Sequence, residues 1–246
     1  MDRALYVGMT GAIQTLRSQA ANNNNLANAS TVGFRAQLVD AQSIPVTGSG
    51  LPSRVNAQLL DQGWDSTSGT IMQTGRDLDV AMRGDAWLAV QASDGTEAYT
   101  KAGNLHVDAT GLLVTSGGQQ VLGDGGPISV PPYSSVSIGG DGTISIVPAG
   151  QGPATLAAVG RLRVMQAQPA DLQRGVDGLM RAAPGVTLNA ASGNSVTAGA
   201  LESSNVNLAG AMVNMIQLAR QFELQTKVMK TTEDNDSASS SLVRMS

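Results

Sequence analysis

Cysteine is absent from the 246-residue chain, and other chemically versatile residues are scarce. Without cysteine the chain forms no disulfide, no thiol nucleophile and no cysteine-based zinc or iron–sulfur site. Its one histidine, His106, leaves little for acid–base or metal chemistry. Aromatic residues make up only 3% of the chain, so large rings do not build the core. We therefore predict no catalytic residue, no cofactor, no metal ion and no small-molecule substrate.

Charged residues are also few, and long apolar runs are absent. Charged residues are 14% of the chain and the net charge is −4, so no basic field exists to hold a nucleic acid. No apolar run reaches the roughly 18 residues of a membrane-spanning helix. The start, MDRALYVGMTGAIQTLRSQAANNNN, has no apolar stretch after a basic segment, and we expect no cleaved signal peptide.

The amino-terminal segment carries a helical pattern. Its seam positions recur at alternating intervals of 3 and 4 residues, which is the spacing of one heptad-repeat stripe on a helix. We name this set the N-terminal stripe: Tyr6, Met9, Ile13, Leu16, Ala20, Asn23 and Ala27. Asn23 is its polar exception, and a buried asparagine in a seam can fix register.

A matching C-terminal stripe lies near the other end of the chain: Leu208, Met212, Met215, Ala219, Phe222, Thr226 and Met229. Asn207, or Ser204 and Asn205 before it, can cap this second helix. Both helices are rich in small residues, which suits close helix–helix contact. The two stripes therefore favour pairing between the termini, within or between subunits; the alternative is packing on the chain's own β domain.

The middle of the chain has strand and turn composition. From residue 102 to 160 there is no Lys or Arg, and 13 of the 59 residues are glycine. Val136 and Ile138 face Ile144 and Ile146 across a glycine-rich turn, which predicts a hairpin. The chain is thus expected to be α+β, with terminal helices (1–35 and 199–246), an extended connector (36–70) and a mainly antiparallel β domain (71–198).

Four features imitate chemical sites. The glycines of Gly123–Gly126 lack the Lys and Ser/Thr of a phosphate loop, and we interpret them as a tight turn. Asp77 and Asp79 flank one residue and resemble a carboxylate pair for glycoside hydrolysis, but a solvated strand face is the better interpretation. His106 should lie on a polar strand face. Arg83-Gly84-Asp85 spells an adhesion tripeptide but is expected to be a turn before the strand at Trp87.

Several segments resemble the bacterial flagellar rod and hook protein family. NLANASTVGF at 25–34 is similar to the family's amino-terminal signature, and LESSNVNL at 201–208 to its carboxy-terminal one. The middle agrees in order at 78–81, 84–90, 99–104 and 127–131. The family-motif residues are Asn25, Leu26, Ala27, Asn28, Gly33, Phe34, Glu202, Asn205, Val206 and Asn207. The opening MDRALY and the run Trp-Leu-Ala-Val look most like the proximal rod members; Ala86 departs from the usual glycine.

This resemblance implies a structural subunit that polymerises into a tubular axial structure. Its terminal helices would form an inner coiled-coil core that orders only on assembly, with the β domain outside. The two stripes would then be the subunit interface. Implied partners are copies of the chain, other proximal and distal rod subunits and the flagellar type III export apparatus, at the basal body in the periplasmic space. Alternatives are a distal rod or hook-type subunit, a glycan-active enzyme using Asp77 and Asp79, and an adhesin.

Overall fold

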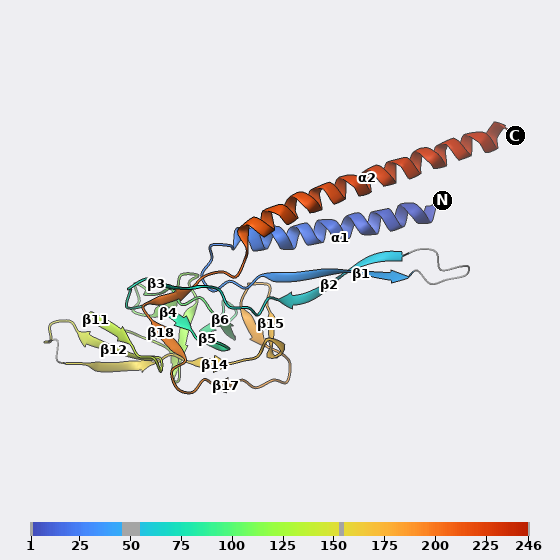
Figure 1. Ribbon diagram of the computed structural model, residues 1–246. Helices are drawn as coiled ribbons and strands as arrows, with labels where there is room; N and C mark the ends of the chain where they lie inside the picture. The colour runs from blue at the N-terminus through green and yellow to red at the C-terminus, as the bar shows by residue number, and fades with distance from the viewer. Residues whose placement is uncertain (1, 46–54, 153–154, 246) are drawn as a thin grey trace. The chain divides into compact units, whose positions relative to one another are not determined.

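The computed structural model describes residues 2–45, 55–152 and 155–245, and its fold is α+β (Figure 1). The chain forms two compact units. Unit 1 comprises Met1–Ala29, Ala36–Asp65 and Val206–Ser246, and unit 2 comprises Ser30–Arg35 and Ser66–Asn205. Each unit is therefore built from segments that are far apart in the sequence.

Unit 1 contains both helices and one β-hairpin. Helix α1 is Asp2–Ala27 and helix α2 is Leu208–Met245, while strands β1 (Gln37–Pro45) and β2 (Val55–Trp64) pair antiparallel. The helices run side by side, and the hairpin lies along the opposite side of α1 (Figure 1). Over their described residues, neither helix holds an apolar stretch long enough for a membrane crossing.

The hairpin replaces much of the extended connector expected at 36–70. Its sequence shows no period because neither face is uniformly apolar: Leu38, Asp40 and Ile44 share one exposed face of β1. Backbone pairing holds the two strands, with a register shift between Leu38 and Val39. A ladder of main-chain hydrogen bonds leaves little trace in side-chain hydropathy, so the sequence pattern missed it.

Unit 2 consists of short strands joined by turns. The largest sheet has the order β15-β16-β6-β5-β9-β8-β7, with β10 on β9 and with β14 between β5 and β17. A three-stranded sheet has the order β11-β12-β13, and two-stranded pairs join β18 to β4 and β19 to β3. Every pairing between named strands in the described residues is antiparallel.

The bounds of these elements are β3 Ile71–Gln73, β4 Val80–Met82, β5 Ala86–Gln91, β6 Glu97–Thr100, β7 Leu105–Val107, β8 Leu113–Thr115, β9 Gln120–Gly123, β10 Gly126–Pro127, β11 Tyr133–Ile138, β12 Thr143–Pro148, β13 Ala157–Arg161, β14 Val164–Gln166, the 3-10 helix Pro169–Asp171, β15 Leu172–Arg174, β16 Met180–Ala182, β17 Asn189–Ala190, β18 Val196–Ala198 and β19 Ala200–Glu202.

The core of unit 2 is aliphatic. Leu88, Leu105, Leu113, Val121 and Ile144 are all fully buried within one cluster. Residues of β5, β7, β8, β9 and β12 supply them, so the core ties most of the strands together. Branched aliphatic side chains therefore fill the core in place of aromatic ones, and they pack well on the pleated surface of a sheet.

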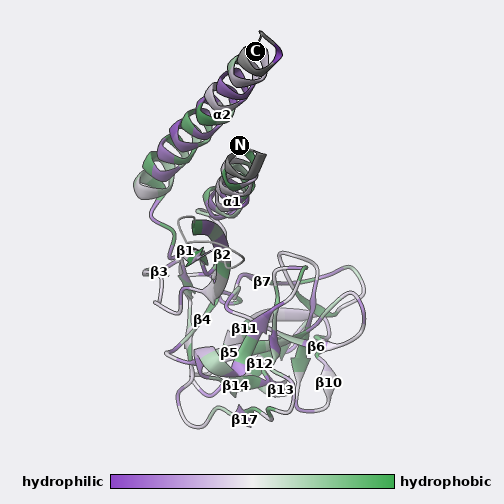
Figure 2. Cartoon of the chain, turned by 90° about the vertical axis from the view of Figure 1, so that its right-hand side faces the viewer, coloured by the Kyte–Doolittle hydropathy of each residue, from purple (hydrophilic) through white to green (hydrophobic). Residues whose placement is uncertain are grey.

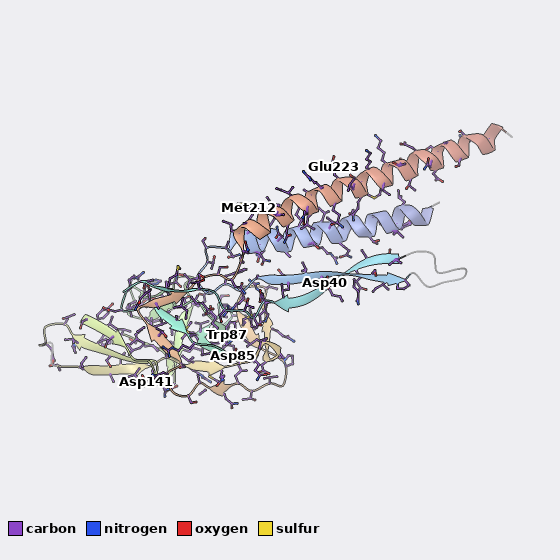
Figure 3. All side chains as sticks on the ribbon, in the orientation of Figure 1. Asp40, Asp85, Trp87, Asp141, Met212 and Glu223 are labelled. Carbon is purple, nitrogen blue, oxygen red and sulfur yellow. The ribbon has the colours of Figure 1, made fainter. Side chains whose placement is uncertain are left out.

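The predicted hairpin in unit 2 is confirmed. Val136 pairs with Ile146 and Ile138 with Ile144, and all four side chains are buried. Its turn holds Asp141, labelled in Figure 3, followed by Gly142 at φ 87°. That conformation favours glycine, because other residues meet a steric penalty there.

Candidate assembly site

The face of α1 that packs against α2 is made of small and polar residues. Gly8 and Gly11 lie so close to α2 that an added Cβ would come within 2.9 Å of Met229 and 3.1 Å of Gln225. The Thr15 hydroxyl lies 3.1 Å from the side-chain oxygen of Gln225. Near the other end of the seam, Asn22 Nδ2 donates to the Ala211 carbonyl at 2.8 Å. Small side chains therefore let the two backbones approach each other.

The N-terminal stripe lies outside this contact. Tyr6, Met9, Ile13 and Leu16 are 56%, 42%, 41% and 48% exposed, and Ala20, Asn23 and Ala27 are exposed as well. The large apolar side chains of the stripe thus face away from α2, while Gly8, Gly11 and Thr15 face toward it. This reverses the usual arrangement of an amphipathic helix in a globular protein.

The C-terminal stripe divides between two environments. Met215, Phe222, Thr226 and Met229 are half-buried, whereas Leu208, Met212 and Ala219 are exposed. Further exposed apolar residues, which the stripe does not include, are Val213, Ile216, Leu224 and Val228. Figure 2 shows apolar and polar residues alternating along the whole of α2, and Met212 is labelled in Figure 3. Apolar residues on several faces of one helix indicate more than one packing partner.

Asparagines fix the ends of the helices. Asn25 holds the start of β1 through two hydrogen bonds: its Nδ2 donates to the Gln37 carbonyl at 2.9 Å and its Oδ1 accepts from the Gln37 amide at 2.8 Å. Asn28 donates to the Asn24 carbonyl at 2.9 Å, just past the end of α1. At α2, Asn207 Oδ1 accepts from the Gly210 amide at 3.0 Å, as predicted for a cap.

The motif residues that belong to unit 2 bring the two ends of that unit together. The Gly33 amide donates to the Glu202 carbonyl at 2.8 Å, and the Asn205 amide donates to the Phe34 carbonyl at 3.3 Å. Gly33 has φ +67°, and an added Cβ would collide with the Lys101 carbonyl group. Only glycine meets both demands, which explains its place in the motif.

Arg35 and Glu202 add a buried ion pair to these contacts. Their side chains are each 3% exposed, with Arg35 Nη2 2.7 Å from Glu202 Oε1. Arg35 also donates to the Thr67 carbonyl, and Glu202 Oε1 accepts from the Gly69 amide at 2.9 Å. We name Gly33, Phe34, Arg35, Glu202 and Asn205 the terminal clamp. Sequence reasoning missed Arg35, although it directly follows the motif.

The backbone of Lys101 lies against Gly33 of the terminal clamp. Its side chain is 1% exposed, its Nζ donates to the Gly84 carbonyl at 2.5 Å, and it lies 5.0 Å from the centre of the Trp87 ring. Burial lowers the pKa of Lys101 from 10.5 to about 8, partly offset by the nearby Glu202 carboxylate.

The expected turn at Arg83-Gly84-Asp85 is confirmed, because the Ala86 amide donates to the Arg83 carbonyl at 3.0 Å.

The other sequence features that resemble chemical sites have structural roles. Gly123 and Gly126 pair across a tight turn, and His106 is exposed on β7, both as expected. The prediction for Asp79 is wrong: it is buried and accepts from Thr74 Oγ1 at 2.7 Å, while Asp77 is exposed. The chain turns here, with the Asp79 amide donating to the Arg76 carbonyl, so strand alternation does not apply. Over the described residues, no cluster of three metal-ligating side chains occurs.

Comparison with known proteins gives both family matches and full-length relatives. Residues 197–242 match the family described as flagellar basal body rod FlgEFG protein C-terminal, and residues 81–146 match the flagellar hook protein FlgE/F/G D1 domain. The chain is 45% identical to the flagellar basal-body rod protein FlgF of Escherichia coli strain K12 and equally to that of Salmonella typhimurium strain LT2, over the full length of each. It is 33% identical to the flagellar basal-body rod protein FlgG of Bacillus subtilis strain 168, over 95% of the chain and 96% of that relative.

Proposed function

Because the chain belongs to the family of flagellar basal-body rod proteins and is a structural subunit of the rod, we propose that it polymerises through its terminal helices into a tubular drive shaft. We place it in the proximal rod, where the shaft joins the membrane motor to the distal rod and hook. Its proposed partners are copies of itself, other rod subunits and the type III export apparatus. It acts there without catalysing a reaction.

The exposed N-terminal stripe is the observation that carries this proposal. Four large apolar residues stand on the surface of α1, although α1 already contacts α2 and the hairpin. A contiguous apolar stripe on a helix is typical of a surface that another helix covers. In a tube, neighbouring subunits bury such stripes, and the helices become a coiled-coil core with unit 2 outside.

The residues at the contact between α1 and α2 give a physical reason for the two helices to become stable only when subunits assemble. Within one subunit the face of α1 toward α2 consists of small and polar residues, while the large apolar residues of the N-terminal stripe stay exposed. Most helical stability in proteins comes from packing an apolar face. The helix pair therefore gains most of its stability when neighbours arrive, which suits a subunit that is exported before it assembles.

Complementation of a non-motile null strain tests the interface. Leu16→Asp should abolish incorporation into purified basal bodies, because the new carboxylate would be buried without a partner in every subunit contact. Leu16 is about half exposed in the single chain, so the variant should remain folded. Phe222→Asp should behave in the same way on α2.

Two controls make this test specific. Ser135→Asp puts the same charge on an exposed strand position of unit 2, and Asp94→Ala changes an exposed turn of the same unit. Both should assemble normally. If Leu16→Asp and Phe222→Asp were incorporated as well as these controls, the terminal helices would not be the polymerisation surface.

A further inference from the structure

Four Asp–Gly pairs occur in the chain, and the fold holds them differently. All four lie in turns of unit 2: Asp94-Gly95, Asp124-Gly125, Asp141-Gly142 and Asp177-Gly178. Among aspartate dipeptides, Asp–Gly forms isoaspartate most readily, because glycine has no side chain that shields its amide nitrogen from the neighbouring carboxyl group. The four pairs therefore share one reactive sequence and differ in their surroundings.

In three of the pairs the glycine amide is held by a hydrogen bond. It donates to the carbonyl three residues earlier: Gly95 to Ala92 at 2.9 Å, Gly142 to Gly139 at 2.9 Å and Gly178 to Gly175 at 3.1 Å. Isoaspartate formation begins when this nitrogen turns toward the aspartate carboxyl carbon and gives up its proton. The hydrogen bond must therefore break before the reaction can start.

The carboxylates of the same three pairs are held as well. Each accepts from the backbone amide two residues further on: Asp94 from Thr96 at 2.9 Å, Asp141 from Thr143 at 3.1 Å and Asp177 from Leu179 at 3.2 Å. Side-chain hydrogen bonds from Thr96, Thr143 and Arg181 are the main reason that the pKa of each of these carboxyl groups lies below the ordinary 3.8. A protonated carboxyl group loses its oxygen as water far more easily than a carboxylate, so these bonds also lower the reactive fraction.

Asp124 and Gly125 have neither restraint. Both are exposed in the two-residue loop between β9 and β10, where Gly123 pairs with Gly126. Within the part of the chain that the structure describes, the Asp124 carboxylate makes no hydrogen bond or ion pair and the Gly125 amide donates to no acceptor. A Cβ built on Gly125 would meet nothing within 4 Å. The two groups that must react are therefore both available.

We propose that Asp124-Gly125 is a site of spontaneous isoaspartate formation in the folded protein. The Gly125 nitrogen attacks the carboxyl carbon of Asp124; a C–N bond forms, a C–O bond breaks, and the hydroxyl group leaves as water with the amide proton. Water then opens the five-membered succinimide at either carbonyl, which returns aspartate or yields isoaspartate with one extra backbone carbon. The reaction needs no oxidant or cofactor, and it does not depend on the proposed assembly.

The position of the site gives the modification a structural consequence and a partner of defined chemistry. The extra carbon lengthens a two-residue loop, so the pairing of Gly123 with Gly126 loses its geometry. Ile128, two residues beyond Gly126, is buried in the core cluster of unit 2. The new carboxylate lies at an exposed position, where it suits an enzyme that methylates isoaspartyl carboxylates with S-adenosylmethionine.

Ageing of the full-length chain tests the proposal. The purified protein is kept near neutral pH at physiological temperature for several weeks, and isoaspartate is located by electron-transfer fragmentation of its peptides. Isoaspartate at Asp124 should accumulate at least tenfold faster than at each of the other three pairs, because those pairs must first lose two hydrogen bonds. In denaturant the four rates should agree within about threefold. Methyl transfer by a purified isoaspartyl methyltransferase gives an independent count of modified chains.

Matched asparagine variants isolate the contribution of the glycine amide. Asp124→Asn and Asp141→Asn both make ammonia the leaving group, so carboxyl protonation no longer matters and the local structure alone distinguishes the two sites. Asp124→Asn should deamidate at least tenfold faster, because the Gly142 amide remains bonded to Gly139. Asp124→Glu should form no isoaspartate at this position, since its side chain would have to close a six-membered ring.

Each outcome supports or overturns the proposal. Equal rates at the four pairs of the folded chain overturn it, and so does an absence of isoaspartate at Asp124. A preference for Asp124 that persists undiminished in denaturant also overturns it, because the sequence rather than the fold would then be the cause. Failure of the proposed function is seen separately, since it depends on whether Leu16→Asp is incorporated into basal bodies.

Discussion

Leu88 in unit 2 and Leu16 in unit 1 show how differently the two units use the same side chain. Leu88 is fully buried in the aliphatic core, whereas Leu16 is 48% exposed on α1. Unit 2 buries most of its large apolar residues in one core cluster. Unit 1 buries alanine and threonine and leaves many of its large apolar residues exposed. The difference shows that unit 2 has an aliphatic core of its own, and it supports the proposal that neighbouring subunits stabilise unit 1.

The largest expected effect is the difference in stability loss between alanine substitutions at these two leucines. Leu88→Ala should lower the free energy of unfolding of unit 2 by about 2–5 kcal/mol, because it leaves a cavity in a packed core. Leu16→Ala should change the unfolding free energy of unit 1 by less than about 0.5 kcal/mol in the free subunit. Urea unfolding followed by Trp87 fluorescence, in a Trp64→Phe background, measures the loss in unit 2, and the helical circular dichroism signal measures that in unit 1. Equal losses would contradict the contrast.

Gly33→Ala should have the next largest effect. The substitution strains a φ of +67° and drives a Cβ against the Lys101 backbone, so we expect a loss of about 1–3 kcal/mol in the unfolding free energy of unit 2. Gly84→Ala is the matched control, since Gly84 has φ +54° with open space around it and should lose only about 1 kcal/mol. Similar losses for both would show that the clamp is not tightly packed.

Lys101 should make unit 2 more stable in mild alkali. Its folded pKa of about 8 lies below the ordinary 10.5, so between these values the unfolded chain binds more protons and stability rises with pH. Tyr99 opposes this only above pH 10, because its pKa is raised from 10.0 to about 12. Unfolding midpoints should therefore rise from pH 8 to 10 and stay flat in Lys101→Met. A flat parent profile would contradict the burial of a charged Lys101.

Loss of the N-terminal cap of α2 should lower stability by a smaller amount. Asn207→Ala removes the acceptor for the Gly210 amide, and about 1 kcal/mol of helix stability is expected to go with it. Asn24→Ala, at an exposed position of α1, should have an effect below about 0.5 kcal/mol. Thermal melts followed by the helical circular dichroism signal compare the two. An effect of Asn24→Ala as large as that of Asn207→Ala would argue against capping.

The smallest effect is acid sensitivity at three turns of unit 2. Hydrogen bonds from Thr96, Thr110 and Thr143 lower the pKa of Asp94, Asp108 and Asp141 below the ordinary 3.8. These contributions are present above pH 3.8 and are lost as the pH falls through the lower folded values. Stability measured from pH 5 downward should fall less steeply in Asp141→Asn than in the parent. Identical slopes would show that the Asp141 turn contributes nothing to acid sensitivity.

Local features of unit 2 were predictable because each rests on neighbours in the sequence. The pairing of Val136 with Ile146 follows from alternation around a glycine turn, and the same local logic placed a helix cap at Asn207 in unit 1. Asp79 was misjudged because a turn at Arg76 interrupts the alternation on which the prediction relied. The hairpin of β1 and β2 escaped notice because its stability lies in backbone pairing.

Long-range features of the assembly site were harder to predict. Heptad spacing identified the N-terminal stripe, but spacing alone does not say which of two faces a partner within the chain will occupy. Gly8, Gly11 and Thr15 form the face toward α2 because they permit close approach, a property of shape rather than hydropathy. Arg35 meets Glu202 only through the fold of unit 2, so no local pattern links them.

Solvent protection of Leu16 in the assembled rod is the most direct test of the proposed interface. A single cysteine introduced by Leu16→Cys should react rapidly with a maleimide in the free subunit, where the position is exposed. In purified basal bodies its labelling rate should fall at least tenfold, while Asp94→Cys in unit 2 should show a much smaller change. Equal labelling of Leu16→Cys in the free and assembled states would contradict the claim that neighbouring subunits cover the N-terminal stripe.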